Sequence, residues 1–147
     1  MKKLLYLIIL LLVLCGCGSK PDIINTKYFQ VEVPKSWENL YLYEIFEPDE
    51  NVYSLVFYDK ASHLSDFGGH VVTISVYYNK DEFDCLPSYE YLGEITNGSK
   101  SYHITTELPT DVQFDVSTQS TYTKLAESYE SIIESVQFIN GYQLVRD

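Results

Sequence analysis

The stretch that decides the fold reads His70-Val71-Val72-Thr73-Ile74-Ser75-Val76-Tyr77-Tyr78. Every second residue from Val72 to Tyr78 is apolar, and the residues between them mix apolar and hydroxyl side chains. A period of two indicates a β-strand, and apolar residues at both parities are typical of a strand that is covered on both faces. The segment is therefore predicted to be a central strand whose two faces differ in polarity.

Further strands are predicted before this segment. Residues 29–33 alternate between apolar and polar side chains and end at Pro34, which cannot donate a hydrogen bond to a neighbouring strand. Residues 41–46 and 52–58 are rich in aromatic and β-branched residues, and the polar segment 47–51 separates them. This pattern predicts a β-hairpin.

A second hairpin is predicted over residues 89–108, with its turn at Asn97-Gly98. Both turn residues tolerate the positive φ of a type I′ turn, which makes this dipeptide a strong hairpin signal. A two-residue loop sets the register of the two strands. We therefore expect Tyr102 to lie opposite Gly93.

The chain is expected to close with one amphipathic helix over residues 118–136. Its apolar residues recur at helical spacing, at Tyr122, Leu125, Tyr129, Ile132, Ile133 and Val136. With the strands, this helix predicts a single domain of the α+β class over residues 28–142, in which an antiparallel β-sheet is packed by helices.

The first seventeen residues predict export. Lys2 and Lys3 precede the apolar run Leu4–Leu14, which is too short for a transmembrane helix and fits a secretory signal. The segment Leu14-Cys15-Gly16-Cys17 resembles the lipobox of bacterial lipoproteins, in which a small residue directly precedes the lipidated Cys.

That resemblance implies a lipoprotein signal peptide over residues 1–16 and a diacylglycerol anchor, with acyl chains such as palmitate, on Cys17. Residues 17–27 would then be the lipidated Cys and a polar tether, and the protein would be held at the extracytoplasmic face of the cell membrane. The alternative is an ordinary signal peptide that is cut nearby without lipid attachment.

The charge balance excludes two classes of partner. The formal net charge is −11, and removal of Lys2 and Lys3 with the signal peptide would make it −13. Nucleic acids and anionic lipid surfaces both attract clustered Lys and Arg, so a basic docking face is not expected here.

Two segments resemble the ends of PsbP-like domains. Phe29-Gln30-Val31-Glu32-Val33-Pro34-Lys35-Ser36-Trp37 is similar to their opening strand, Pro and Trp, and Ile132-Ile133-Glu134-Ser135-Val136-Gln137-Phe138 is similar to their closing helix and short last strand. The resemblance implies an α/β/α sandwich around an antiparallel sheet. Many such domains in bacteria are small envelope lipoproteins, and members of this fold serve mostly as assembly or binding modules.

The chain has three histidines, and two of them lie close together in the sequence. His63, Asp66, His70 and His103 are the residues that a metal-dependent hydrolase would use. Zinc requires three or four converging ligands, and the spacing of these residues does not enforce convergence. We therefore expect no metal, no other cofactor and no catalytic residue, and the hydrolase remains the alternative.

The chain is also rich in tyrosine, with 14 residues of this type. Exposed Tyr supplies a large contact area at a low entropy cost. The speculative binding residues are Tyr41, Tyr43, Tyr77 and Tyr89. The sequence thus predicts a non-catalytic binding or accessory module that contacts an envelope protein or ligand. An acidic inhibitor or sensor of a basic envelope protein is a further alternative.

Overall fold

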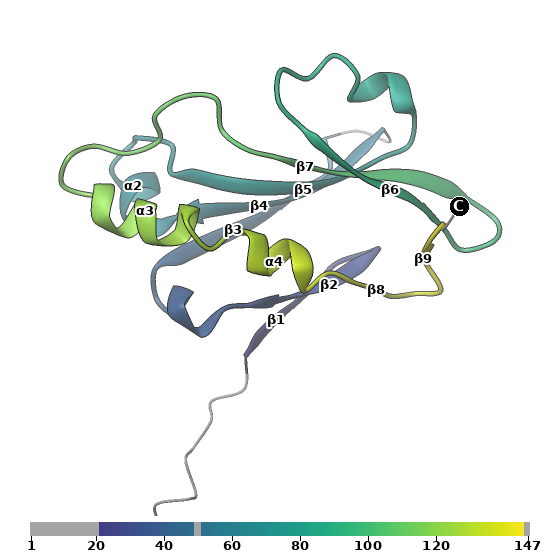
Figure 1. The fold of residues 1–147 in the computed structure, drawn as a ribbon, viewed down its shortest axis with the longest axis horizontal. Helices are drawn as coiled ribbons and strands as arrows, with labels where there is room; N and C mark the ends of the chain where they lie inside the picture. Colours follow the sequence, from purple (N-terminus) through teal and green to yellow (C-terminus); the bar gives the residue numbers. More distant parts are fainter. Residues whose placement is uncertain (1–20, 49–50, 146–147) are drawn as a thin grey trace, which may run out of the picture.

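Strand β5 (His70–Tyr77) lies inside a six-stranded antiparallel sheet, as its sequence pattern predicts. The structure is a computed structural model that describes residues 21–48 and 51–145. The predicted signal peptide (1–16), Cys17 and the first residues of the predicted tether lie outside the described residues. The elements form a mixed α/β arrangement with two antiparallel sheets and a few helices (Figure 1).

The strands of the larger sheet follow the order β3-β4-β5-β7-β6-β9. Besides β5 they are β3 (Tyr41–Phe46), β4 (Val52–Asp59), β6 (Glu90–Thr96), β7 (Ser101–Glu107) and β9 (Gln143–Leu144). The hairpin predicted at 41–58 is confirmed, because β3 and β4 pair antiparallel with Tyr43 opposite Phe57.

A second sheet packs against one face of the first. It consists of β1 (Asp22–Asn25), β2 (Phe29–Val33) and β8 (Gln137–Phe138), in the order β1-β2-β8. Strand β2 is the strand predicted before Pro34 and is confirmed. Strand β1 corrects the prediction of a polar tether over 17–27, because its residues pair with β2 and Ile24 enters the core.

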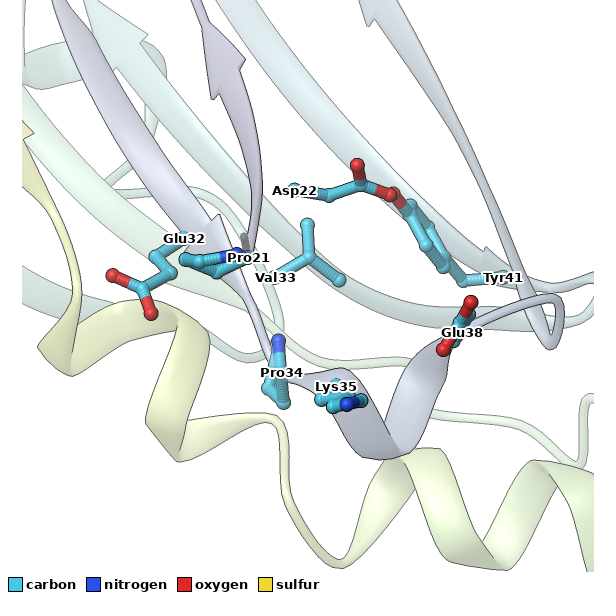
Figure 2. A pocket seen from close by; sticks show the side chains of 8 residues that line it. All are labelled: Pro21, Asp22, Glu32, Val33, Pro34, Lys35, Glu38 and Tyr41. Atoms are coloured by element: carbon cyan, nitrogen blue, oxygen red, sulfur yellow. The ribbon is translucent and has the colours of Figure 1, made fainter. Parts of the chain in front are cut away.

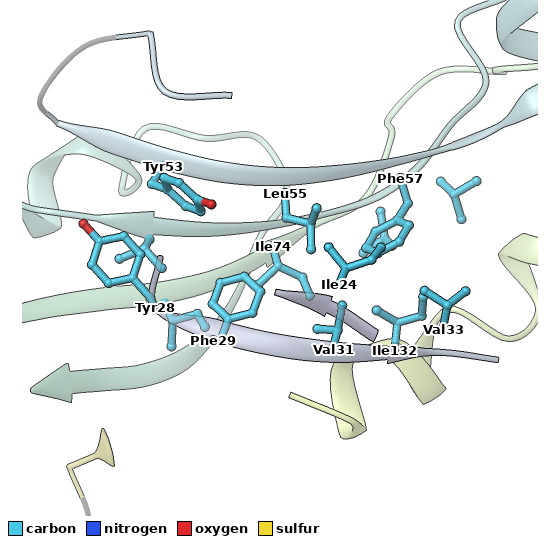
Figure 3. Packing of buried hydrophobic residues seen from close by; sticks show 14 of the residues in the cluster. Ile24, Tyr28, Phe29, Val31, Val33, Tyr53, Leu55, Phe57, Ile74 and Ile132 are labelled. Atoms are coloured by element: carbon cyan, nitrogen blue, oxygen red, sulfur yellow. The ribbon is translucent and has the colours of Figure 1, made fainter. Parts of the chain in front are cut away.

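The hydrophobic core lies between the two sheets. Side chains of the smaller sheet point toward side chains of the larger one in Figure 3, for example Phe29 and Val31 toward Leu55 and Ile74. All four are fully buried. The other face of β5 carries hydroxyl groups at Thr73, Ser75 and Tyr77, and the Ser75 hydroxyl hydrogen-bonds that of Ser54 on β4 at 2.9 Å. The predicted difference in polarity between the faces of β5 is therefore confirmed.

Trp37 joins the core to the C-terminal helices. It ends the short 3-10 helix η1 (Lys35–Trp37) and is fully buried, with its ring centroid 5.8 Å from that of Phe57. Its Nε1 donates a hydrogen bond of 2.9 Å to Ser128 Oγ. A buried indole N–H requires such an acceptor.

The single helix predicted at 118–136 is wrong in its continuity. The segment forms α3 (Gln119–Ala126) and α4 (Glu130–Glu134), with a turn between them. Ser128 lies in this turn and its hydroxyl donates to the Lys124 carbonyl at 2.9 Å while it accepts from Trp37. A hydroxyl that bonds the carbonyl four residues earlier bends a helix, and here it helps to end one. The apolar stripe still faces inward, since Tyr122, Leu125 and Ile132 are buried.

Two shorter helices lie in the connections of the larger sheet. The helix α2 (Lys60–Leu64) follows β4 directly, and the side chain of Asp59 accepts a hydrogen bond of 2.9 Å from the Ser62 amide at its first turn. The 3-10 helix η2 (Lys80–Glu82) follows β5 and is succeeded by the buried Phe83. Neither was predicted.

The predicted register of the second hairpin is also wrong. Thr96 pairs with Ser101, so the loop has four residues, and Gly93 lies opposite Ile104 instead of Tyr102. Side chains close this longer loop: Asn97 Oδ1 accepts from the amides of Ser99 and Lys100, at 3.0 and 2.9 Å. Only Gly98 of the turn pair has a positive φ, of 84°.

We predict that Gly98→Val destabilises the fold by about 1–2 kcal/mol, because a β-branched residue resists positive φ. A Cβ at this position would meet no atom within 4 Å, so the cost comes from the backbone alone. Urea denaturation of the parent and the variant measures it. Gly98→Asn is the matched control and should cost less, since Asn tolerates this conformation. An equal midpoint for the parent and the Val variant would contradict the loop geometry.

Candidate functional site

Strand β3 carries an exposed apolar surface at the edge of the larger sheet. Tyr43 and Ile45 face the smaller sheet, because they pair with the core residues Phe57 and Leu55. Each is nevertheless 46% exposed, and Phe46 on the opposite face is 58% exposed. The smaller sheet has three strands and the larger one six, so it does not cover the outermost strand. We call Tyr41, Tyr43, Ile45 and Phe46 the β3 surface.

The two tyrosine rings of the β3 surface are held from the core outward. Trp37 packs on Tyr41 with ring centroids 6.1 Å apart, and Tyr41 stacks on Tyr43 at 6.5 Å with an angle of 22° between the rings. The Tyr43 ring also lies 6.5 Å from that of the buried Phe57. Rings fixed in this way lose little entropy when a partner covers them.

The backbone of β3 is open on one side. Within the described residues it pairs only with β4 and ends the order of the sheet. An edge strand presents a row of N–H and C=O groups to which another strand can pair. Apolar side chains on both faces of such a strand are typical of sites that take up an extended segment.

A pocket of about 400 Å³ adjoins this surface at the start of β1 and around η1 (Figure 2). It is lined by the carboxylates Asp22, Glu32 and Glu38 and by the ammonium group of Lys35, so negative charge predominates. The Tyr41 hydroxyl donates a hydrogen bond of 3.1 Å to Asp22 Oδ2. Burial, together with this carboxylate, raises the pKa of Tyr41 to about 12. The phenol therefore stays protonated at neutral pH and remains a donor.

The other two predicted binding tyrosines lie elsewhere. Tyr77 is only 7% exposed, and its hydroxyl donates to Glu107 at 3.0 Å. The expectation that it lies on the surface is wrong, because Phe83 packs on its ring. Tyr89 is exposed and its ring contacts Phe83, but it precedes β6, which is separated from β3 by three strands. Of the four predicted tyrosines, the structure brings together Tyr41 and Tyr43.

The residues of the hydrolase alternative are not brought together. His63 and His70 both lie beside the Tyr58 ring, with centroids 4.5 and 6.3 Å from it. His103 lies opposite Tyr77, at the far end of β5 from His70. Among residues 21–48 and 51–145, no three His, Cys, Asp or Glu side chains are grouped as metal ligands.

Each histidine has its own hydrogen-bond partner. His63 Nδ1 lies 2.9 Å from the Gly68 carbonyl, His70 Nε2 lies 2.8 Å from Thr73 Oγ1, and His103 Nδ1 lies 3.0 Å from the Tyr91 hydroxyl. Burial lowers the pKa of His70 below its ordinary value. The neutral ring is therefore the form that the folded state favours.

Sequence reasoning missed Ile45 and Phe46 of the β3 surface and the acidic pocket beside it. The apolar letters of 41–46 predict a strand, but they do not say which strand ends the sheet. Asp22 was assigned to the tether. The sequence shows that the segment around Asp22 is charged, but it does not show that this segment pairs with β2.

Comparisons with known proteins do not assign the chain to a family. No family model matches the chain, and no curated protein and no solved structure is significantly similar to it. In the part of the chain that the structure describes, no helix is both long and apolar enough to cross a membrane.

We predict that the His70→Gln variant is less sensitive to acid than the parent. The folded state holds the His70 pKa below that of the unfolded chain, so the neutral ring stabilises the fold above about pH 6.5, and this contribution is lost as the pH falls toward the lowered pKa. Between about pH 7.5 and about pH 5 the parent should lose more free energy of unfolding than the variant. Denaturation curves at both values measure the difference. Parallel losses would show that burial of His70 does not disfavour its charged form.

Proposed function

We propose that this protein is a lipid-anchored binding module of the bacterial cell envelope. It is held at the extracytoplasmic face of the membrane by lipid on Cys17, and it carries out no catalysis itself. The observation that carries the binding role is the β3 surface, an open strand edge whose aromatic rings are fixed against the core.

Anchorage rests on the lipobox resemblance at Leu14-Cys15-Gly16-Cys17. A diacylglycerol group has two acyl chains, which hold a protein on a membrane where one chain alone binds only reversibly. The position of Pro21 is compatible with this arrangement, because it is exposed and precedes β1 at the surface of the fold.

The partner that suits the β3 surface is an extended segment with apolar and basic side chains. Backbone pairing along β3 would supply affinity, and Tyr43, Ile45 and Phe46 would contact alternate side chains of the segment. The carboxylates of Asp22 and Glu38 beside Tyr41 favour positive charge at that end. The net charge of −11 also steers a basic partner toward the protein. This deepens the alternative of an acidic protein that captures a basic one.

We also propose membership of the PsbP-like class on the two motifs at 29–37 and 132–138. In support of it, both motifs lie in elements of the same small sheet and its helix: β2 packs against α4 and pairs with β8. The hydrolase receives less support, because its four residues are spread over two ends of β5 in the described structure.

Replacement of Cys17 by Ser tests the anchor. We predict that the Ser variant either leaves the membrane fraction or accumulates as an uncleaved precursor, because Ser cannot form the thioether. Cell fractionation and the mass of the N-terminal peptide measure both outcomes. Cys15→Ser is the matched control and should stay in the membrane fraction. A Cys17→Ser chain that is processed and retained like the parent would disprove the lipid assignment.

A peptide titration tests the binding role. We predict that a decapeptide of alternating Lys and Val binds the protein and that its Glu/Val counterpart does not. The Lys side chains carry the positive charge that the carboxylates of the acidic pocket attract, and the Glu side chains are repelled. Ile45→Ala should weaken the binding of the Lys/Val peptide about tenfold, which corresponds to the loss of one buried apolar contact of about 1.4 kcal/mol. Fluorescence anisotropy of labelled peptide measures both affinities.

The control for this titration is Val145→Ala, which shortens an exposed apolar side chain beside β9, the opposite edge strand of the sheet. It should leave the affinity unchanged. Equal weakening by both substitutions would show that the effect is not local to β3 and would contradict a site there.

A further inference from the structure

The three most exposed large hydrophobic residues of the described chain lie in two neighbouring loops or directly before one of them. Val116 is 92% exposed, Val112 is 75% exposed and Leu64, the last residue of α2, is 70% exposed; Phe67, at 47%, lies in the loop that follows Leu64. One loop joins α2 to β5, and the other joins β7 to α3. We call Leu64, Phe67, Val112 and Val116 the apolar tip.

The two loops are joined and their backbones are held. The Gly69 amide donates to the Gln113 carbonyl at 3.0 Å, and Ser62 Oγ donates to Thr118 Oγ1 at 2.9 Å. The Gly68 backbone lies so close to the Gln113 side chain that a Cβ there would collide with it. The apolar side chains of the tip are therefore presented to the outside by a fixed backbone. Soluble proteins rarely leave apolar side chains gathered in this way without a partner.

The apolar tip lies on the side of the fold on which β1 begins. Tyr41 pairs with Asp59, the last residue of β4, and α2 begins at the next residue. The Tyr41 hydroxyl also bonds Asp22, which follows Pro21. In Figure 1, α2 and α3 lie at one end of the larger sheet and the β6–β7 turn lies at the other. The start of β1 therefore lies on the α2 side of the fold, nearer to the apolar tip than to the β6–β7 turn.

We propose that the apolar tip contacts the lipid bilayer to which the chain is tied. This inference rests on the lipid anchor of the proposed function. Four residue steps separate Cys17 from Pro21, and an extended chain of that length reaches at most about 14 Å. Such a short link keeps the start of β1 close to the bilayer, and the side of the fold that carries the tip can then turn toward it. Apolar side chains can then enter the boundary between headgroups and acyl chains.

The charges around the tip agree with an apolar contact. Asp66 and Asp111 are exposed in the two loops. The exposed cations near them are Lys60 of α2 and Lys124 of α3, and Lys124 lines one hollow with Val116 and Glu127. This set does not attract an anionic surface, so the contact would depend on burial of apolar area and would change little with salt.

The experiment uses the full chain, purified from membranes after processing and reconstituted in vesicles of phosphatidylethanolamine and phosphatidylglycerol, with or without brominated acyl chains. Val116→Trp places a fluorescent reporter on the tip. Ser99→Trp is the matched control in the exposed turn at the opposite end of the sheet. The native Trp37 is fully buried and gives the same background in both.

Brominated lipid should quench the added Trp of Val116→Trp about twofold and leave that of Ser99→Trp unchanged, because quenching requires contact with acyl chains. Val112→Asp, placed in the Val116→Trp chain, should reduce the quenching. Equal quenching of the two reporters by brominated lipid, in a chain whose Cys17 peptide carries lipid, overturns the inference. The tip is then assigned to a contact with a protein. A Cys17 peptide without lipid overturns the proposed anchor, and the inference with it. The mass of the Cys17 peptide therefore distinguishes a missing anchor from a tip that does not contact the bilayer.

Discussion

The larger sheet has apolar side chains on its inner face along all of its main strands, and the sheet that packs against it has half as many strands. This difference in width constrains the rest of the molecule. The smaller sheet covers the middle of the inner face, where Phe29 and Val31 meet Leu55 and Ile74. Helices α3 and α4 complete the cover through Leu125 and Ile132. Strand β3 lies beyond both, and its side chains remain exposed although their neighbours on β4 are core residues.

The same constraint explains why Trp37 is central. Its indole packs against Phe57 of the larger sheet, and its Nε1 bonds Ser128 between α3 and α4. One side chain thus links the first third of the chain to the last. It supports Tyr41 from behind, so the rigidity of the β3 surface depends on a residue that no partner would touch.

Much of the fold could be predicted because it follows from local periodicity. The alternation in 29–33 and in 70–77 depends only on which residues point inward, and the structure confirms both strands. The continuity of the last helix could not be predicted, because Ser128 ends α3 while bonded to a residue 91 positions away. The register of the 97–100 loop was predicted wrongly for a local reason. The Asn97 side chain accepts hydrogen bonds from two backbone amides and so closes a longer loop than the Asn-Gly dipeptide alone indicates. The β3 surface and the apolar tip escaped prediction because exposure depends on which elements stop short of them.

Strand β1 gives the N-terminal end of the fold a mechanical property. A pull on residue 21 enters at the Asp22–Val33 pair and is resisted by the short ladder that ends at the Asn25–Gln30 pair. Only Ile24 of this strand is buried, and β1 is the outermost strand of its sheet. Under tension, β1 is the element that yields first, while Phe29 and the core behind it stay packed.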